Sequence, residues 1–79
     1  MLKVNFIKTD LDVALTFAQI ASQTGDRDKA VRNQRNARKA YDTLVRYMDS
    51  ASLDRSDLDA ITRKLALLKS ALLGLGERF

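Results

Sequence analysis

Residues 54–75 carry the most regular apolar pattern in the chain. Leucine and isoleucine recur there at heptad spacing, at Leu58, Ile61, Leu65, Leu68, Leu72 and Leu75. This spacing places their side chains on one side of an α-helix. Asp54 is a good N-cap, Leu53 and Leu58 have the spacing of a hydrophobic staple, and Gly74 with Gly76 favours a helix end. The pattern predicts a helix over residues 54–75.

A second apolar stripe, with spacings of three, four and seven, predicts a helix over residues 26–49. Its members are Ala30, Ala37, Tyr41, Leu44 and Met48. Gln34 interrupts the stripe. We interpret it as a hydrogen-bonded polar residue at the edge of the helix seam, because buried polar groups in proteins are almost always hydrogen-bonded. A ligand contact is the less favoured alternative.

The pattern of residues 9–24 predicts a helix that is apolar around most of its circumference. Thr9 can cap it, with Asp12 in the capping-box position. Such a wide apolar surface needs two neighbouring helices. Gly25 is expected to end this helix in the left-handed conformation, and Asp26 can cap the next helix, so the chain should reverse over a very short turn.

Residues 1–8 show a different, alternating pattern, in which Leu2, Val4 and Phe6 are separated by Lys3 and Asn5. A period of two is typical of a β-strand. The chain offers no second strand to pair with it. We therefore predict an extended arm over residues 1–8, and pairing with its copy in a second chain would be one way to bury it.

Length and composition fit one small helical domain. The chain has 79 residues, 46% of them hydrophobic and 30% charged, with no proline and 3 glycines. One domain of residues 1–79 is all that this length allows. We predict an all-α fold, an antiparallel three-helix bundle in up-down-up order. Its expected core comprises Leu15, Phe17, Ile20, Tyr41, Leu44, Met48, Ile61, Leu65, Leu68 and Leu72.

Candidate chemistry is sparse. The chain has neither histidine nor cysteine, which excludes disulfides and the usual zinc sites. Asp54, Asp57 and Asp59 lack the ligand spacing of a calcium loop, and Gly74-Leu-Gly76 does not follow a strand as a phosphate-binding turn would. We predict no catalytic residues, no metal and no cofactor. The sequence also lacks a membrane-spanning apolar run and a signal peptide, so the expected location is the cytoplasm.

Positive charge is concentrated on the second helix. The chain has a formal net charge of +4 and a sequence pI near 9.8. Arg32, Arg35, Lys39 and Arg46 fall along one line opposite the Tyr41 stripe, where an acidic protein or a nucleic acid could meet them. The alternative is an ordinary solvated face, with Asp28–Arg32 and Asp42–Arg46 as i,i+4 ion pairs. Against this, Arg35 and Lys39 place like charges one turn apart.

The chain has more large apolar side chains than the core of three helices can bury. Phe6 in the arm, with Leu67 and Leu73 off the main seam of the third helix, forms the candidate self-association surface. Burial in a homodimer would remedy the small core. Isolated exposed leucines are common on monomers, so the monomer stays an alternative.

The hairpin of the first two predicted helices resembles a tetratricopeptide repeat unit. The residues that carry the resemblance are Ala14, Phe17, Ala18, Gly25, Ala30 and Ala37. The match covers about a third of the chain and departs from the repeat at Ala21 and Gln34. It implies a helical hairpin and protein interaction, but it transfers no binding residues. The chain also resembles the short helical proteins that many bacteria encode.

The sequence thus favours a non-catalytic protein–protein interaction or adaptor module that self-associates, with an unidentified protein partner. The alternative is a nucleic-acid-binding protein that uses the basic face of the second helix. The chain has no recognition-helix signature and no aromatic residues on that face, so the protein partner is preferred. An enzyme is the third and weakest interpretation.

Overall fold

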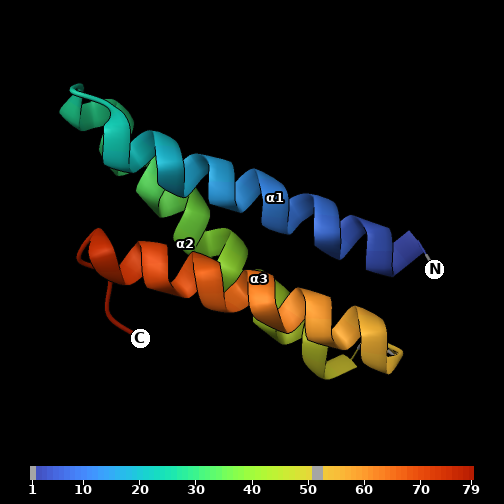
Figure 1. The fold of residues 1–79 in the computed structure, drawn as a ribbon. Coiled ribbons are helices and arrows are strands. Elements are labelled where there is room, and N and C mark those ends of the chain that lie inside the picture. The colour runs from blue at the N-terminus through green and yellow to red at the C-terminus, as the bar shows by residue number, and fades with distance from the viewer. Residues whose placement is uncertain (1, 51–52) are drawn as a thin grey trace.

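The computed structural model describes residues 2–50 and 53–79, with side chains for residues 5–48 and 53–79. The chain forms α1 (Leu2–Gln23), α2 (Arg27–Ser50) and α3 (Arg55–Gly74), with no strand in the described residues (Figure 1). The three helices pack against one another in a body of 40 × 21 × 17 Å. The all-α prediction is confirmed, and the predicted bounds of the second and third helices differ from the observed bounds by one residue at each end.

The prediction of an extended arm over residues 1–8 is wrong for residues 2–8, and residue 1 lies outside the described residues. Leu2–Lys8 form the first turns of α1, so Thr9 lies inside the helix instead of capping it. Ile7 is 2% exposed and Leu11 is fully buried, so the helical stripe of Leu11, Ala14 and Ala18 extends back to Ile7. A helical stripe that joins the main core outweighs a short alternating run that has no partner strand.

The turn between α1 and α2 is short, as predicted, but the conformation of its glycine differs from the prediction. Gly25 is not among the residues with positive φ, so its expected left-handed conformation is wrong. Instead, the Thr24 hydroxyl accepts a hydrogen bond from the backbone N–H of Asp26 at 3.2 Å. The Asp26 carboxylate caps α2 as predicted by accepting from the backbone N–H of Lys29. Polar side chains thus accept hydrogen bonds from backbone N–H groups of this turn and of the first turn of α2.

The two ends of α3 follow the sequence signals closely. The Asp54 carboxylate accepts from the backbone N–H of Asp57 at 2.8 Å, which confirms the N-cap. At the other end, Gly76 has φ +96° and donates to the carbonyl of Leu73, while the N–H of Glu77 bonds the carbonyl of Leu72. These two bonds are the Schellman motif, with glycine at C′. Gly74 is still helical, so Gly76 terminates the helix.

The core combines alanines of α1 and α2 with larger apolar residues from all three helices. Predicted core residues that are fully or almost fully buried are Leu44, Ile61, Leu68 and Leu72, and those half-buried against them are Leu15, Phe17, Tyr41, Met48 and Leu65. Ile20 lies outside this cluster at intermediate exposure. Ile7, Leu11, Ala14, Ala18 and Ala37 complete the core and were not predicted as members. Leu58 is 43% exposed, so it is not part of the buried stripe of α3 to which the sequence pattern assigned it.

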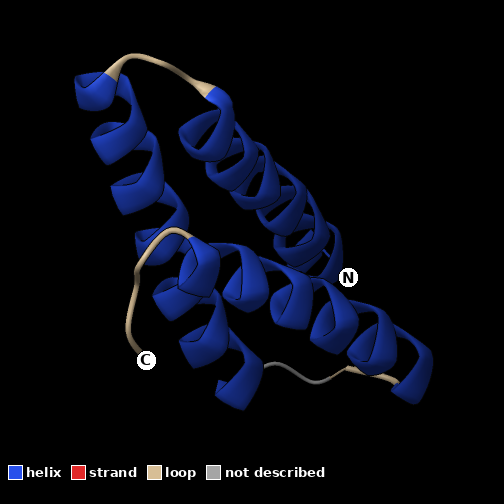
Figure 2. Ribbon diagram, turned by 60° about the vertical axis from the view of Figure 1, so that its left-hand side comes forward, coloured by secondary structure: helices blue, strands red, loops and turns tan. Residues whose placement is uncertain are grey.

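Helix α1 is the central element, as its wide apolar surface predicted. It has more contacts with α2 and with α3 than those two helices have with each other. Figure 2 shows the 24–26 turn joining α1 to α2, while α3 crosses α2. Two ion pairs join α1 to α3: Lys8 to Asp57 at 2.8 Å, and Asp12 to Lys64 at 2.7 Å. Among the described residues, none of the helices is both long and apolar enough to cross a membrane.

Candidate interaction surfaces

Helix α2 presents the predicted basic face to solvent. The side chains of Arg32, Arg35, Lys39 and Arg46 are all exposed, and together they are called the basic ridge below. Their spacing of three, four and seven residues keeps them on one side of α2, opposite the buried Ala37 and Leu44. With about 1.5 Å of rise per residue, the ridge is about 21 Å long.

The basic ridge has no ion-pair partners among the residues whose side chains are described. Neither of the predicted i,i+4 pairs, Asp28–Arg32 and Asp42–Arg46, is present there. Asp42 instead accepts from Arg38, one turn earlier, at 3.1 and 3.2 Å. Arg35 and Lys39 therefore face solvent one turn apart without a neutralising carboxylate, a local repulsion that a merely solvated surface does not require.

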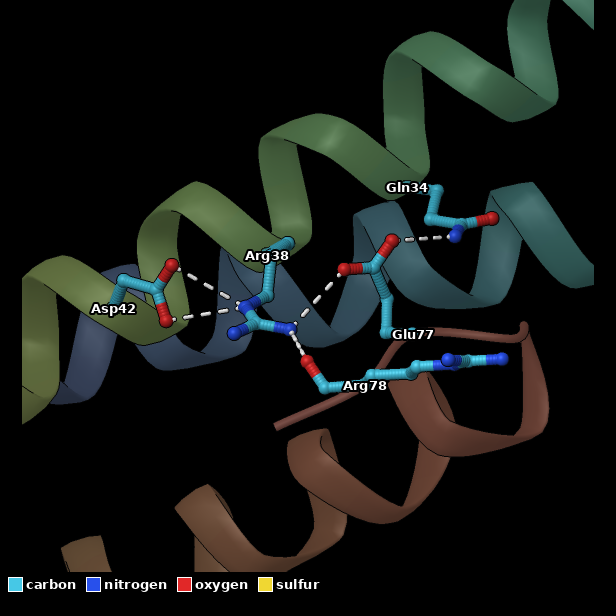
Figure 3. A network of polar contacts seen from close by, with 5 residues as sticks. All are labelled: Gln34, Arg38, Asp42, Glu77 and Arg78. Atoms are coloured by element: carbon cyan, nitrogen blue, oxygen red, sulfur yellow. Dashed lines mark hydrogen bonds and ion pairs between the residues drawn. The ribbon is translucent and has the colours of Figure 1, made fainter.

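Arg38 is the main polar residue that sequence reasoning did not identify (Figure 3). Besides Asp42, its guanidinium donates to the Glu77 carboxylate at 3.2 Å and to the backbone carbonyl of Arg78. Gln34 donates to the other Glu77 oxygen at 2.7 Å, which confirms the interpretation of Gln34 as a hydrogen-bonded polar residue at the seam. No short-range pattern signals these contacts, because they join residues about 40 positions apart in sequence.

Residues 77–79, called the return segment below, fold back onto α2. The Schellman turn at Gly76 directs the chain from the end of α3 toward the middle of α2. The Phe79 ring packs under the Arg38 guanidinium, 4.0 Å from the ring centroid, and meets the Tyr41 ring edge-on at 4.9 Å between centroids. The return segment thus contributes charge, main-chain and aromatic contacts to a helix far from it in sequence.

Two open depressions flank the basic ridge. The larger, about 510 Å³, is lined by Val31, Gln34, Arg35, Arg38, Lys39, Asp42 and Glu77. The other, about 440 Å³, lies between α1 and α2 and is lined by Asp10, Phe17, Asn36, Lys39, Ala40, Thr43 and Leu44. Lys39 borders both depressions. The ridge therefore adjoins apolar, amide and acidic side chains as well as bulk solvent.

The predicted self-association residues are all exposed. Phe6, Leu67 and Leu73 are 51%, 62% and 52% exposed. Phe6 belongs to α1 and meets Tyr47 of α2 edge-on, with 6.1 Å between ring centroids. Leu67 and Leu73 are six residues apart in α3, which separates them by about 120° around the helix axis. Leu67 and Leu73 therefore lie on different faces of α3.

Polar chemistry in the described residues is confined to the surface. None of the polar or charged side chains described is buried. In the same part of the chain, no three acidic side chains form a group that could hold a metal ion. The four ion pairs described all involve partly exposed groups.

The comparisons with known proteins give no family assignment: no family model, curated protein or solved structure matches the chain.

Proposed function

We propose that the protein is a non-catalytic interaction module that binds an acidic segment of a partner protein on the basic ridge. The observation that carries this proposal is the contrast within α2. Arg38 is paired with carboxylates, whereas Arg32, Arg35 and Lys39 are exposed and have no partner among the described side chains. A row of unpaired cations attracts an acidic partner and raises its association rate.

The surroundings of the ridge favour a protein partner over a nucleic acid. Val31 and Gln34 line the larger depression together with Asp42 and Glu77. Apolar and amide groups can contact the side chains of a mixed peptide, whereas a phosphate backbone offers Val31 no apolar partner. Aromatic stacking is also missing from the ridge itself, because Tyr41 packs against Phe79 and Tyr47 against Phe6.

The test compares two charge-matched double variants of the full chain. Arg35→Glu with Lys39→Glu reverses the ridge, and Arg55→Glu with Arg63→Glu makes the same change in net charge at exposed positions of α3. A labelled peptide of alternating glutamate and leucine is the probe, followed by fluorescence anisotropy. The ridge variant should bind at least about tenfold more weakly than wild type, and the α3 variant within about threefold. Equal losses in both variants would show that only net charge matters.

Nucleic-acid binding is the second candidate, favoured by the continuity of the ridge over about 21 Å. Mixed-sequence oligonucleotides titrated at increasing salt distinguish it from peptide binding. Each phosphate contact adds about 0.7 to 0.9 to the slope of log K against log salt. Oligonucleotide binding that is tighter than peptide binding, with a slope that the ridge variant flattens, would replace the acidic-peptide proposal.

Self-association is proposed separately and requires no ridge contact. Leu67, 62% exposed, is the most exposed large apolar residue described, so it is the best position to probe. Light scattering should give a mass above the 8.9 kDa of one chain, and Leu67→Glu or Phe6→Glu should reduce it. A mass of 8.9 kDa at every concentration would remove this proposal.

For the arrangement of the helices, we propose the up-down-up antiparallel bundle. The ion pairs between α1 and α3 support it, because residue numbers rise together along both helices, from 8 with 57 to 12 with 64. The tetratricopeptide-like spacing of residues 14–37 stays a prediction, and the proposed binding function does not depend on it.

A further inference from the structure

The return segment occupies its position on α2 in the way that a short peptide ligand would. We propose that Gln34, Arg38 and Tyr41 form a recognition site for a segment of a partner protein with an acidic residue, any residue and an aromatic residue in sequence. The chain's own residues 77–79 occupy this site until the partner segment displaces them. This site borders the basic ridge along the larger depression but has different partners. Arg38 and Gln34 bond the Glu77 carboxylate at the end of α3 (Figure 3), whereas Arg35 and Lys39 are exposed to solvent.

The contacts define what the site selects at each ligand position. The first position needs a carboxylate, because one Glu77 oxygen accepts from Gln34 at 2.7 Å and the other from Arg38 at 3.2 Å. An amide and a guanidinium that bond the two oxygens of one carboxylate give geometric as well as charge selectivity. A neutral glutamine at this ligand position would lose the ion pair with Arg38.

The second and third positions have different requirements. Arg78 contributes its backbone carbonyl to Arg38, a contact that any amino acid can make. Phe79 contributes its ring, which lies 4.0 Å from the Arg38 guanidinium carbon, 5.3 Å from the Lys69 ammonium and 4.9 Å from the Tyr41 ring centroid. A ring with cations at its face is a specific aromatic contact. The recognised pattern is therefore an acidic residue, any residue and an aromatic residue.

The internal occupant is held weakly enough to exchange. Phe79 is 47% exposed, and the side chain of Glu77 is 25% exposed. Solvent-exposed ion pairs and cation–π contacts hold less strongly than buried ones. The return segment occupies the site mainly because its short connection to α3 gives it a high effective concentration, of millimolar order for short linkers. A partner with the same pattern and additional contacts would displace it.

The test removes the internal competitor from the full chain and supplies the same pattern in trans. Glu77→Gln with Phe79→Ala empties the site, and the probe is a capped synthetic peptide with the sequence of residues 75–79. Chemical-shift titration of ¹⁵N-labelled protein should show at least about tenfold tighter binding to this variant than to wild type. Adding Arg38→Gln should abolish the gain, whereas adding Arg35→Gln should leave it.

Each remaining outcome also decides the question. Equal peptide affinity in wild type and the emptied variant, or a gain that survives Arg38→Gln, would overturn the proposal. If the emptied variant fails to fold by circular dichroism, Phe79→Ala alone carries the same comparison. A wild-type dimer that Arg38→Gln converts to a monomer would assign the site to the return segment of a second copy instead. Neutral replacement of two ridge residues, Arg35→Gln with Lys39→Gln, should weaken peptide binding far less than Arg38→Gln does, so the two proposals can fail separately.

Discussion

Gly76 holds the backbone in a conformation that other residues rarely adopt. Its φ of +96° allows the Schellman turn that ends α3 and sends the return segment to α2. Gly74, two residues earlier, has helical backbone. A Cβ atom added at either glycine would meet no other atom within 4 Å. The two glycines therefore differ in backbone conformation and not in available space.

Alanine substitutions at these glycines should have opposite effects. Gly76→Ala should lower the free energy of unfolding by about 1 kcal/mol, because a Cβ is strained at positive φ. Gly74→Ala should raise it by up to about 0.5 kcal/mol, since alanine restricts the unfolded chain and favours the helix. Urea unfolding followed by circular dichroism measures both. A stabilising Gly76→Ala would show that the turn is not held in this conformation.

At the same scale, sequence reasoning succeeded for Gln34 and failed for Arg38. Gln34 interrupts an apolar stripe, and such an interruption signals by itself that the polar group has a partner. Arg38 is one of several arginines on a basic helix. Asp42 at i+4 signals one ion pair for it, but nothing local signals its contacts with residues 77–79. Its role depends on a turn at Gly76 that brings Glu77 back across the fold. Contacts of that kind depend on tertiary structure, which periodicity does not encode.

Helix α3 shows how sharply exposure changes between adjacent positions. Leu68 is fully buried in the core, whereas Leu67, its neighbour, is 62% exposed. Both have the same side chain and the same helix propensity, so replacing each by alanine isolates the contribution of burial. The free energy of unfolding of so small a domain is only about 3 to 5 kcal/mol when no disulfide or metal assists.

Leu68→Ala should therefore lower the free energy of unfolding by about 2 to 5 kcal/mol, enough to unfold much of the protein at room temperature. Leu67→Ala should change it by less than about 0.5 kcal/mol. The helical signal in far-ultraviolet circular dichroism, recorded against temperature, distinguishes the two. Similar losses for both variants would mean that Leu67 is buried in solution, as an oligomer interface would require.

The starts of α2 and α3 were predictable because each carries a capping residue. The start of α1 was not, because an alternating pattern and a helical pattern overlap there. Asp54 and Asp26 each mark a helix start that the structure confirms. At the chain start, Phe6 belongs to an alternating run and Ile7 to a helical stripe. The choice between them depends on whether Ile7 finds a core to join, and α3 and α2 supply that core. The burial that decides it is tertiary, so the local pattern alone misassigned residues 2–8.

For the whole molecule, two ion pairs between described side chains mark how α1 lies along α3. Lys8 with Asp57 and Asp12 with Lys64 join residues 49 and 52 positions apart in sequence. All four groups are partly exposed, so each pair stabilises the fold only slightly. The two pairs favour the present register of α1 against α3, since sliding α1 by one turn would break both of them.

Charge reversal tests this register. Lys64→Glu should lower the free energy of unfolding by about 0.5 to 1 kcal/mol at low salt, because the introduced carboxylate would face that of Asp12. Adding Asp12→Lys should restore most of the loss, and 0.5 M salt should shrink both effects through screening. Urea unfolding at two salt concentrations measures the free energy of unfolding of the wild type, of each single variant and of the double variant. Failure of Asp12→Lys to rescue Lys64→Glu would show that these two side chains do not pair and would remove their support for the proposed parallel course of α1 and α3.

Two aromatic contacts among the described residues give the protein one optical reporter near Phe6 and another near Phe79. The sequence contains two tyrosines and no tryptophan. Tyr47 meets Phe6 in α1, and Tyr41 meets Phe79 in the return segment. Intrinsic tyrosine emission is therefore divided between the start of α1 and the return segment, and Tyr47→Phe leaves only the signal that senses Phe79. Departure of the return segment from α2 can then be followed in real time without an attached dye.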